Sequence, residues 1–296
     1  MSNDKPDACA IAMLGLGSMG TALAGTLAST GHSVTVWNRS RDRATALQPL
    51  CTVAETVSGA CQRAELILTC FSNFDVTFDV LKQVGVVEAL TGKTLVQMST
   101  ATPDQVEALR TFCQSNGINF LDAKIAVTPR QIGGSMAVIF FAGPQALYDR
   151  HRTVFQALAG RASYMGERIE AAVLSDFAFL SLYFAGTIGV LHGAAFAKAS
   201  GLNVDQFFDL VPSFLQEIAA RSQSFKDMVS ANDYSNVQSA LKTDLAAATL
   251  LSDAVDQSGM KMTFPKALIS LMQESVAQGL GDSDSAAMVK TFANKG

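Results

Sequence analysis

Apolar and polar positions alternate in two different ways along this chain of 296 residues, and the change falls near residue 166. Before that point, short apolar runs are separated by stretches with a helical period, which is the pattern of buried parallel strands joined by helices. After it, the strand pattern stops and long helical stretches follow. The pattern predicts an α/β fold, with an N-terminal doubly wound parallel sheet and an all-helical C-terminal part.

The apolar runs that we expect to form strands span 9–14, 33–37, 66–69, 94–98, 119–121, 137–142 and 162–165. Helices are expected in the same part at 19–30, 103–115 and 144–159. In the second part they are expected at 171–200, 204–221, 237–257, 264–279 and 285–292. These elements divide the chain into a sheet domain (1–166), a linking helix (167–200) and a helical domain (201–296).

The stretch 171–200 is the most unusual part of the pattern. It is apolar or small throughout, apart from Asp176, His192, Lys198 and a few hydroxyl side chains. A helix of that length extends roughly 45 Å, and one that is apolar on all sides must be buried or lie in lipid. Three glycines and several polar groups within 177–197, and the lack of an aromatic or basic belt at both ends, argue against a membrane span. We expect a buried helix that joins two domains.

Composition narrows the class of protein. Hydrophobic residues make up 49% of the chain and charged residues 16%, which indicates much buried surface and a subunit interface. A net charge of −4 without a basic run disfavours nucleic acid as a partner. No C-x-x-C pair occurs among the five cysteines, which indicates reduced thiols rather than disulfides or a metal site. The polar N-terminus shows no signal peptide, so we expect a cytoplasmic protein.

A glycine-rich motif lies between the first expected strand and the first expected helix. It reads Gly15-Leu16-Gly17-Ser18-Met19-Gly20, a G-x-G-x-x-G inside a βαβ unit. Gly15 allows a tight turn, Gly17 allows the backbone to approach a pyrophosphate, and Gly20 allows close packing of helix on strand. The helix N-terminus offers free N–H groups to the phosphates. The motif predicts dinucleotide binding; the alternative is a glycine-rich turn that only packs.

The residues after the second strand predict which dinucleotide binds. NAD enzymes usually place Asp or Glu there, whereas this chain has Asn38, Arg39 and Ser40, with Arg43 following. Guanidinium and hydroxyl groups bind a 2′-phosphate, so the expected cofactor is NADPH. The alternative is a solvated basic loop. After the strand 66–69, the loop Cys70-Phe71-Ser72 is expected to border the same dinucleotide.

Taken together, the motifs resemble those of the β-hydroxyacid dehydrogenase superfamily, and within it most closely the imine reductases and reductive aminases. The resemblance covers nearly the whole chain. Its pieces are GLGSMG at 15–20, VTVWNRS at 34–40, STATP at 99–103, IAVTPRQIGG at 125–134 and LSDFAFL at 174–180, followed by Leu191-His192. Hydroxyacid dehydrogenases of this architecture have a catalytic Lys where LSDFAFL has Asp176, and imine reductases often have Asp there.

The resemblance implies that Asp176 is the catalytic residue of an NADPH-dependent imine reductase. An imine accepts hydride readily as the iminium cation, and a carboxylate stabilises that cation or protonates the imine if its pKa is raised. The alternative is an Asp at a helix start that complements the helix dipole or pairs with Arg168.

Further site residues are implied by the same resemblance. Thr100 is expected beside the nicotinamide ribose or the substrate. The expected substrate pocket contains Ala126, Val127, Thr128, Leu180, Phe184 and Asp244. For Asp244 the alternative is a solvated face of its helix. Lys124 and Arg130 stand where the family pattern differs, which makes a substrate with a carboxylate conceivable.

A long apolar helix needs more cover than one small helical domain provides. By the resemblance we expect an intertwined homodimer, in which each long helix is wrapped by the C-terminal domain of the other chain and the active site lies at their interface. Competing functions are a β-hydroxyacid dehydrogenase or carbonyl reductase, which the missing Lys disfavours, and a non-catalytic NADPH-binding protein. A binding module with purely structural glycines is a further alternative.

Overall fold

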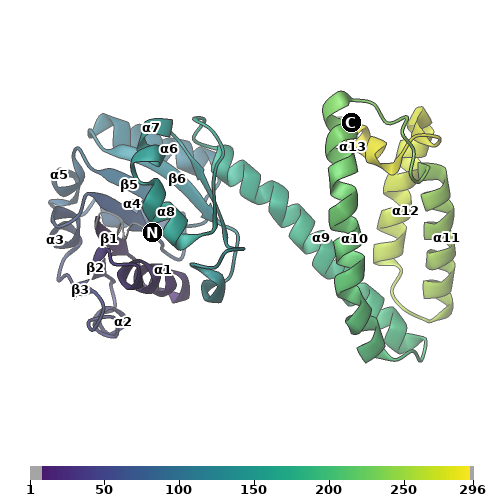
Figure 1. Ribbon diagram of the computed structural model, residues 1–296, viewed down its shortest axis with the longest axis horizontal. Helices are drawn as coiled ribbons and strands as arrows, with labels where there is room; N and C mark the ends of the chain where they lie inside the picture. The colour runs from purple at the N-terminus through teal and green to yellow at the C-terminus, as the bar shows by residue number, and fades with distance from the viewer. Residues whose placement is uncertain (1–8, 294–296) are drawn as a thin grey trace, which may run out of the picture. The chain divides into compact units, whose positions relative to one another are not determined.

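A computed structural model describes residues 9–293. Contacts within the chain divide it into two compact units, one ending at Leu182 and one starting at Tyr183. The dividing point lies inside the helix α9, Ala171–Ala199, so one continuous helix belongs to both units. Figure 1 shows the sheet unit in purple to teal and the helical unit in green to yellow.

The first unit is built on a sheet that has eight strands among the described residues, in the order β3-β2-β1-β4-β5-β6-β7-β8 (Figure 1). Neighbouring strands are parallel, except that β6 and β7 are antiparallel. The strand order turns back at β1, so the predicted doubly wound sheet is confirmed. The strands are β1 Ala10–Leu14, β2 Ser33–Trp37, β3 Thr52–Val53, β4 Leu66–Thr69, β5 Thr94–Gln97, β6 Asn119–Ile125, β7 Val138–Ala142 and β8 Arg161–Tyr164.

Helices connect the strands and cover the sheet. They are α1 Ser18–Ser29, α2 Arg41–Thr45, α3 Val57–Gln62, α4 Phe74–Leu81, α5 Val86–Leu90, α6 Pro103–Ser115, α7 Gln145–Arg150 and α8 Arg152–Leu158, with a 3₁₀ turn η1 at Pro129–Gln131. Alternate residues of β1 enter two separate cores: Ile11 and Met13 join one, and Ala12 and Leu14 join the other. The sheet is therefore buried on both faces, which is why its strands read as continuous apolar runs.

The antiparallel β7 is a difference from the fully parallel alternation that the sequence pattern suggests. A parallel crossover usually needs a helix of its own. The segment between β6 and β7 contains only the 3₁₀ turn η1, so the chain returns along the edge of β6. The pairing then becomes parallel again between β7 and β8, which α7 and α8 connect.

Several further elements differ from the expectation. The strand expected at 119–121 continues to Ile125 as β6. The helix expected at 144–159 consists of α7 and α8, which meet at His151. The short strand β3 and the helices α3, α4 and α5 were not expected from the pattern, because they are too short or too mixed to show a clear period.

The second unit consists of helices. After α9 come α10 Val204–Ala231, α11 Leu241–Gln257, α12 Thr263–Ser275, a π-helical turn η2 at Val276–Leu280, a 3₁₀ turn η3 at Ser285–Ala287, and α13 Met288–Ala293. The all-helical prediction is confirmed. α10 runs well past the expected end at 221, even though Pro212 lies inside it. Its N-cap is Asn203, whose Oδ1 accepts hydrogen bonds from the backbone N–H groups of Asp205 and Gln206.

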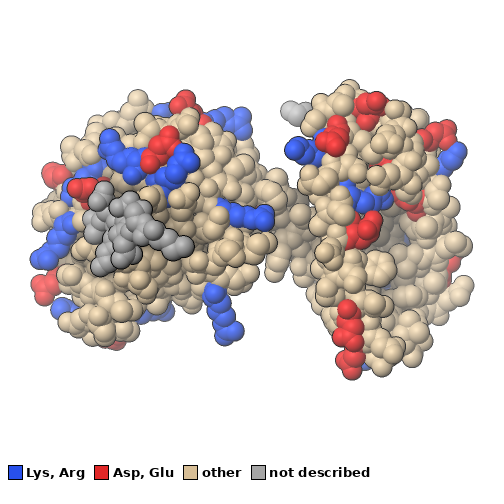
Figure 2. Space-filling model, in the orientation of Figure 1, with Lys and Arg blue, Asp and Glu red and all other residues tan. Residues whose placement is uncertain are grey.

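Within the described residues, α9 is the one helix long and apolar enough to cross a membrane, judged by length and composition alone. Many of its large apolar side chains are exposed in the single chain: Leu182, Tyr183, Phe184, Ile188 and Leu191 are each more than half exposed. The expected burial of this helix is therefore not achieved by one copy of the chain. On the face drawn in Figure 2, acidic and basic side chains are scattered over both units without a continuous basic patch.

Candidate active site

A cleft of about 510 Å³ lies at the carboxyl ends of β1, β2 and β4. The loops that follow these strands line it, which is where open α/β sheets bind ligands. The cleft brings together every residue expected to bind the cofactor except Thr100: Gly15, Leu16, Gly17, Ser18, Met19, Gly20, Asn38, Arg39, Ser40, Arg43, Cys70, Phe71 and Ser72. Their roles in cofactor binding stay predictions.

The three motif glycines have different surroundings. Gly15 has a φ of +93°, and a Cβ there would lie 2.5 Å from the carbonyl oxygen of Cys70. A Cβ on Gly20 would lie 2.0 Å from the carbonyl oxygen of Gly15. A Cβ on Gly17 would meet no atom of the chain within 4 Å. Gly15 and Gly20 are thus required by packing, whereas Gly17 leaves open space beside the start of α1, where no side chain caps the helix.

Asn38 joins two sides of the cleft. Its Oδ1 accepts a hydrogen bond from the backbone N–H of Leu16 at 2.9 Å, and its Nδ2 donates one to the carbonyl oxygen of Ser40 at 3.0 Å. The amide therefore holds the glycine-rich loop against the loop that follows β2. Both the acceptor and the donor of one side chain are needed for this arrangement.

The basic residues after β2 differ in their partners. Arg41 forms an ion pair with Glu55, with 3.6 Å between Nη2 and Oε1. Among residues 9–293, no ion pair engages Arg39 or Arg43, and both are exposed at the cleft. An arginine without a carboxylate partner at the edge of a cleft is suited to bind a phosphate.

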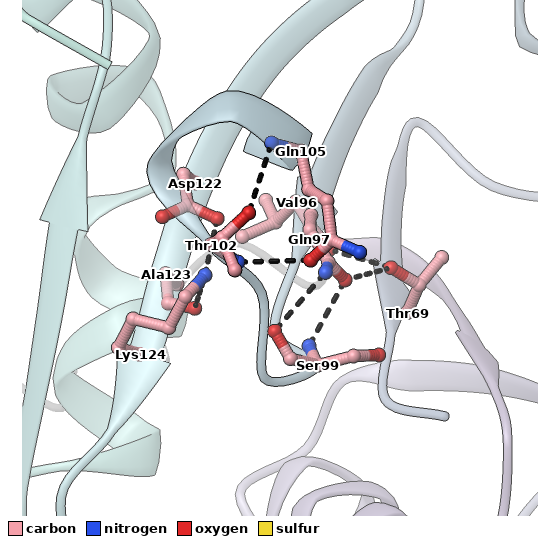
Figure 3. Close-up of polar contacts among 9 residues, drawn as sticks. All are labelled: Thr69, Val96, Gln97, Ser99, Thr102, Gln105, Asp122, Ala123 and Lys124. Atoms are coloured by element: carbon pink, nitrogen blue, oxygen red, sulfur yellow. Dashed lines mark hydrogen bonds and ion pairs between the residues drawn. The ribbon is translucent and has the colours of Figure 1, made fainter. Parts of the chain in front are cut away.

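Polar contacts fix the loops after β4 and β5 (Figure 3). The Gln97 Oε1 accepts from the Thr69 hydroxyl at 3.1 Å and from the Ser99 N–H at 2.9 Å. The Ser99 hydroxyl in turn accepts from the N–H of Phe71 at 2.8 Å. This buried network holds the loop Cys70-Phe71-Ser72 against the cleft. Burial raises the pKa of the Cys70 thiol to about 11, so it stays protonated at neutral pH.

Thr100 follows this network directly and is exposed, outside the residues that line the cleft. The next residues start α6 with a capping box, in which Thr102 and Gln105 each bond the backbone N–H of the other (Figure 3).

Asp176 lies in the second turn of α9 and is half-buried. Ala172, four residues earlier, is fully buried against Phe140 and Ala142 of β7. Phe179, three residues later, stacks on Phe140 with 5.2 Å between ring centroids. Burial raises the pKa of the Asp176 carboxyl, while the positive charge of Lys124 lowers it. The alternative partner, Arg168, lies 3.9 Å from Glu170 instead.

Sequence reasoning missed a buried ion pair near this point. The Lys124 Nζ lies 2.5 Å from the Asp122 Oδ1, and both side chains are almost completely buried (Figure 3). A strand that ends at residue 121 leaves both residues in the connecting segment. In the structure both belong to β6, and both are buried. The signal available in the sequence was the i, i+2 spacing of the two charges, which puts both on one face of a strand.

The expected substrate residues fall in both units. In the first unit, Ala126, Val127 and Thr128 follow β6, and Leu180 lies on α9. The Thr128 hydroxyl bonds the Gln131 side chain at 3.0 Å within the turn η1. Their substrate roles stay predictions.

In the second unit are Phe184, on α9, and Asp244, in the first turn of α11. The Asp244 Oδ1 accepts a hydrogen bond from the Ser239 hydroxyl at 2.5 Å. This local contact is consistent with a structural role at the helix start, although Asp244 is only half-buried. Within residues 9–293 no group of three or more His, Cys, Asp or Glu side chains is placed to hold a metal ion.

The fold and the cleft define the class of the protein: a two-part oxidoreductase in which a dinucleotide-binding sheet domain precedes a helical domain. The family model for the NAD binding domain of 6-phosphogluconate dehydrogenase matches residues 10–166. The model for the C-terminal domain of the NADPH-dependent reductive aminase-like proteins matches residues 169–294. The chain belongs to the imine reductase and reductive aminase family, as the sequence resemblance implied.

Individual relatives cover nearly the whole chain. An NADPH-dependent reductive aminase of Aspergillus oryzae is 27% identical over 286 residues, which are 95% of this chain and 96% of that protein. An imine reductase of Pseudomonas sp. has 31% identity and a TM-score of 0.88, with 97% of this chain and 100% of that chain covered. An imine reductase of Myxococcus stipitatus in complex with NADP+ has 26% identity and a TM-score of 0.88, with 95% and 99% covered.

Proposed function

We propose that the protein reduces C=N bonds, converting imines or iminium ions, cyclic ones among them, to amines with NADPH. The observation that carries the proposal is Asp176, a half-buried carboxylate on the apolar helix α9 where hydroxyacid dehydrogenases of this architecture have Lys. A carboxylate there stabilises a cation, and an iminium ion is a cation whereas a ketone is neutral. Membership of the imine reductase and reductive aminase family supports the same chemistry.

NADPH is proposed to lie in the cleft at the carboxyl ends of β1, β2 and β4. The residues fit this group: the open space at Gly17 and the uncapped start of α1 suit a pyrophosphate. Arg39 and Arg43 form no ion pair among residues 9–293, and together with the Ser40 hydroxyl they suit a 2′-phosphate. When bound, NADPH supplies the hydride. The NADPH-dependent relative and the NADP+ complex of the Myxococcus enzyme support this choice of cofactor.

Asp176 is proposed to act on the charge of the substrate nitrogen. Its ionised form stabilises an iminium ion through the electrostatic attraction of opposite charges in a partly buried site. Burial raises the pKa of this carboxyl, which also suits it to donate a proton to a neutral imine. In both cases the carboxylate favours the state in which the carbon of the C=N bond accepts hydride.

We propose that substrates need no carboxylate of their own. Lys124 is one of the two basic residues, with Arg130, that suggested such a substrate, but Asp122 already neutralises it and its side chain is only 3% exposed. An ammonium group in a buried ion pair is not available to a ligand unless the pair is broken, which is costly.

A homodimer is the proposed assembly, with the α9 helices covered by the partner copies. The exposed apolar residues of α9 support this proposal, since an apolar surface of this extent is typical of an interface. Each helix is proposed to be wrapped by the helical unit of the other chain, so that residues from both copies complete the substrate pocket. The five cysteines are free thiols, which supports a cytoplasmic location.

The reaction class is tested by measuring NADPH oxidation with the purified protein. The panel contains cyclic imines, matching ketones with and without an amine, and 3-oxo acids. Oxidation that depends on an imine, or on ketone and amine together, is the expected result. Oxidation with ketones or 3-oxo acids alone would assign the protein to the carbonyl reductases, and tight NADPH binding without turnover across the panel would favour the non-catalytic alternative.

Asp176→Asn tests the residue that carries the proposal. We expect turnover to fall by on the order of 10²-fold or more, which is typical for loss of one electrostatic contact to the transition state. The dissociation constant for NADPH should stay unchanged. Glu170→Gln is the matched control, because Glu170 lies near the start of the same helix and pairs with Arg168 instead. Unchanged turnover in Asp176→Asn would remove this carboxylate from the mechanism.

A further inference from the structure

The side chains of Lys124 and Asp122 form an ion pair that is almost completely buried. The Lys124 Nζ donates hydrogen bonds to the Asp122 Oδ1 at 2.5 Å and to the carbonyl oxygen of Ala123 at 3.1 Å (Figure 3). The Asp122 Oδ2 is buried and has no hydrogen-bond partner among the described residues. Burying two charges costs solvation that their attraction rarely repays in full, so such a pair calls for a role other than stability.

Strand register places this pair beneath α9. Asp122 lies opposite Ala142 and Lys124 lies opposite Phe140 in the antiparallel pairing of β6 with β7. Residues directly opposite each other on neighbouring strands project from the same face of a sheet. Phe140 and Ala142 pack against Ala172 of α9, so Asp122 and Lys124 project toward the start of this helix.

Asp176 lies on the same side of α9. Ala172, Asp176 and Phe179 follow the i, i+4, i+7 spacing that forms one stripe along a helix. Both ends of the stripe touch β7, since Ala172 packs against it and Phe179 stacks on Phe140. The carboxyl of Asp176 therefore belongs to the face of α9 that covers the Lys124–Asp122 pair.

The charges of the three residues interact. Burial raises the pKa of Asp176, and the positive charge of Lys124 opposes this rise. Burial also raises the pKa of Asp122, to about 6, and the negative charge of Asp176 adds to that rise. The side chains that β7 turns to this helix, Val138, Phe140 and Ala142, are apolar. In the first unit, the charged groups that face Asp176 from the packed strands are thus Lys124 and Asp122 of β6.

We propose that Lys124 is a positioning residue for Asp176: its ammonium group, fixed by Asp122 beneath α9, supplies the positive charge that keeps the Asp176 carboxyl ionised for a cationic substrate. This inference rests on the proposed function and assigns a task to a residue outside the substrate contacts. Because Asp122 balances Lys124, the remaining charge of the cluster is the carboxylate of Asp176. An arriving iminium ion then makes the cluster neutral.

Without Lys124, two partly or fully buried carboxylates would lie close together with no cation between them. Such pairs retain a proton that isolated carboxylates release. The two carboxylates then titrate as a pair, and whenever Asp176 holds the shared proton it does not attract an iminium ion by charge, so loss of Lys124 should weaken the reaction most at low pH. The acid limb of the profile of kcat/KM against pH should then move to higher pH.

The experiment measures ionisation of Asp176 directly in the full chain. Aspartate labelled with ¹³C at the side-chain carboxyl gives a titration curve by NMR, and the Asp176 signal is assigned by its loss in Asp176→Asn. Lys124→Gln removes the charge but keeps a donor for Asp122, and we expect the pKa of Asp176 to rise by about one unit. Lys124→Arg keeps the charge and should restore a value close to that of the unmodified protein.

Two further variants make the test specific. Lys93→Gln is the matched control, because the Lys93 Nζ donates to the carbonyl oxygens of Cys61 and Gln62 in α3 and not to a carboxylate of the Asp176 cluster. It should leave the Asp176 titration unchanged. Asp122→Asn removes the charge that balances Lys124, so the pKa of Asp176 should fall; this opposite shift provides the test if Lys124→Gln does not fold.

An Asp176 titration that stays unchanged in both Lys124→Gln and Asp122→Asn would overturn the inference. An equal rise in Lys124→Arg and Lys124→Gln would overturn it as well, because the effect would then not depend on charge. The proposed function fails separately, if the unmodified protein reduces no imine. The NMR titration needs no substrate, so its result stands whatever the outcome of the activity assay.

Discussion

At the scale of single residues, some basic side chains already form an ion pair within the described residues and others do not. Arg41 pairs with Glu55, and Lys124 pairs with Asp122. Arg39, at the edge of the cleft, forms no ion pair with any residue in 9–293. A guanidinium without a carboxylate partner beside a dinucleotide-type cleft is suited to bind an anionic group of a ligand.

Replacing this guanidinium should change cofactor preference. In Arg39→Ala we expect NADPH to bind roughly 10- to 100-fold more weakly, since hydrogen bonds between charged groups contribute about 1.5–3 kcal/mol. NADH, which lacks the 2′-phosphate, should bind almost as before. Titration calorimetry with both cofactors checks this, with Arg41→Ala as the control for a neighbouring arginine that is already paired. Equal losses for both cofactors would contradict a role at the 2′-phosphate.

His151 allows a prediction about how the stability of the folded state depends on pH. His151 is buried between α7 and α8, its Nε2 lies 3.0 Å from the Thr94 hydroxyl, and burial lowers its pKa to about 4. The unfolded chain has a histidine pKa of about 6.5, so it binds more protons than the folded chain between pH 6.5 and pH 4. His151 therefore makes the folded state lose stability as the pH falls through this window.

Denaturant unfolding at a series of pH values measures this effect. Between pH 7 and pH 5 the original protein should lose on the order of 1 kcal/mol more than His151→Gln, allowing for the solvent that still reaches the ring. His32, which is also a buried histidine of the sheet unit, serves as a comparison through His32→Gln. Parallel pH curves for the original protein and His151→Gln would show that His151 does not titrate in this range.

At the scale of elements, turns and strands set by neighbouring residues could be predicted from the sequence, whereas the antiparallel pairing of β6 with β7 could not. The strand β1, the start of α1 and the motif glycines follow from apolar runs and turn chemistry within a few residues of one another. The antiparallel β7 and the extension of β6 depend on contacts between segments distant in the sequence. The Lys124–Asp122 pair was missed for the same reason: two charged residues end an apolar run unless the opposing strand and helix are known to cover them.

Two glycines of α1 allow a test of how closely this helix packs against β1. A Cβ on Gly20 would lie 2.0 Å from the carbonyl oxygen of Gly15, whereas one on Gly25 would meet no atom within 4 Å outside its own helix. Gly20→Ala should therefore destabilise the protein by about 2 kcal/mol or more, since α1 must move away from β1. Gly25→Ala, in the same helix, should be neutral or stabilising by up to about 1 kcal/mol.

Thermal unfolding of both variants measures the difference. Because Gly20 also borders the cleft, its substitution should weaken NADPH binding, while Gly25→Ala should bind NADPH as the original protein does. Similar stabilities for the two variants would mean that the contact between Gly20 and Gly15 does not limit the packing of α1.

At the scale of the whole molecule, α9 is too apolar for the single chain. Many of its large side chains are exposed in one copy. The family models that match the sheet domain and the helical domain meet just before this helix starts. The sequence pattern indicated this helix correctly, and its composition indicated that it needs cover. The proposed homodimer would provide this cover, and neither the period of the helix nor the structure of one copy contains such a partner.

The assembly prediction is a dimer of about twice 31.3 kDa in sedimentation equilibrium. Leu182→Glu together with Leu191→Glu places charges at two exposed positions, on opposite sides of α9, and should weaken association by several kcal/mol, giving monomer at micromolar concentration. Leu50→Glu, at an exposed leucine of the sheet unit, is the control and should remain dimeric. A stable monomer of the original protein would contradict the proposed assembly.

The double hydrogen bond of Asn38 has a consequence for how cofactor choice can change over evolution or in the laboratory. The amide ties the backbones of Leu16 and Ser40 together without using the side chains at 39, 40 and 43. The scaffold that we propose for the pyrophosphate is thereby separate from the positions that we propose for the adenosine end. Variation confined to those three positions, with Asn38 retained, is expected to exchange one nicotinamide cofactor for the other while the glycine-rich loop keeps its shape.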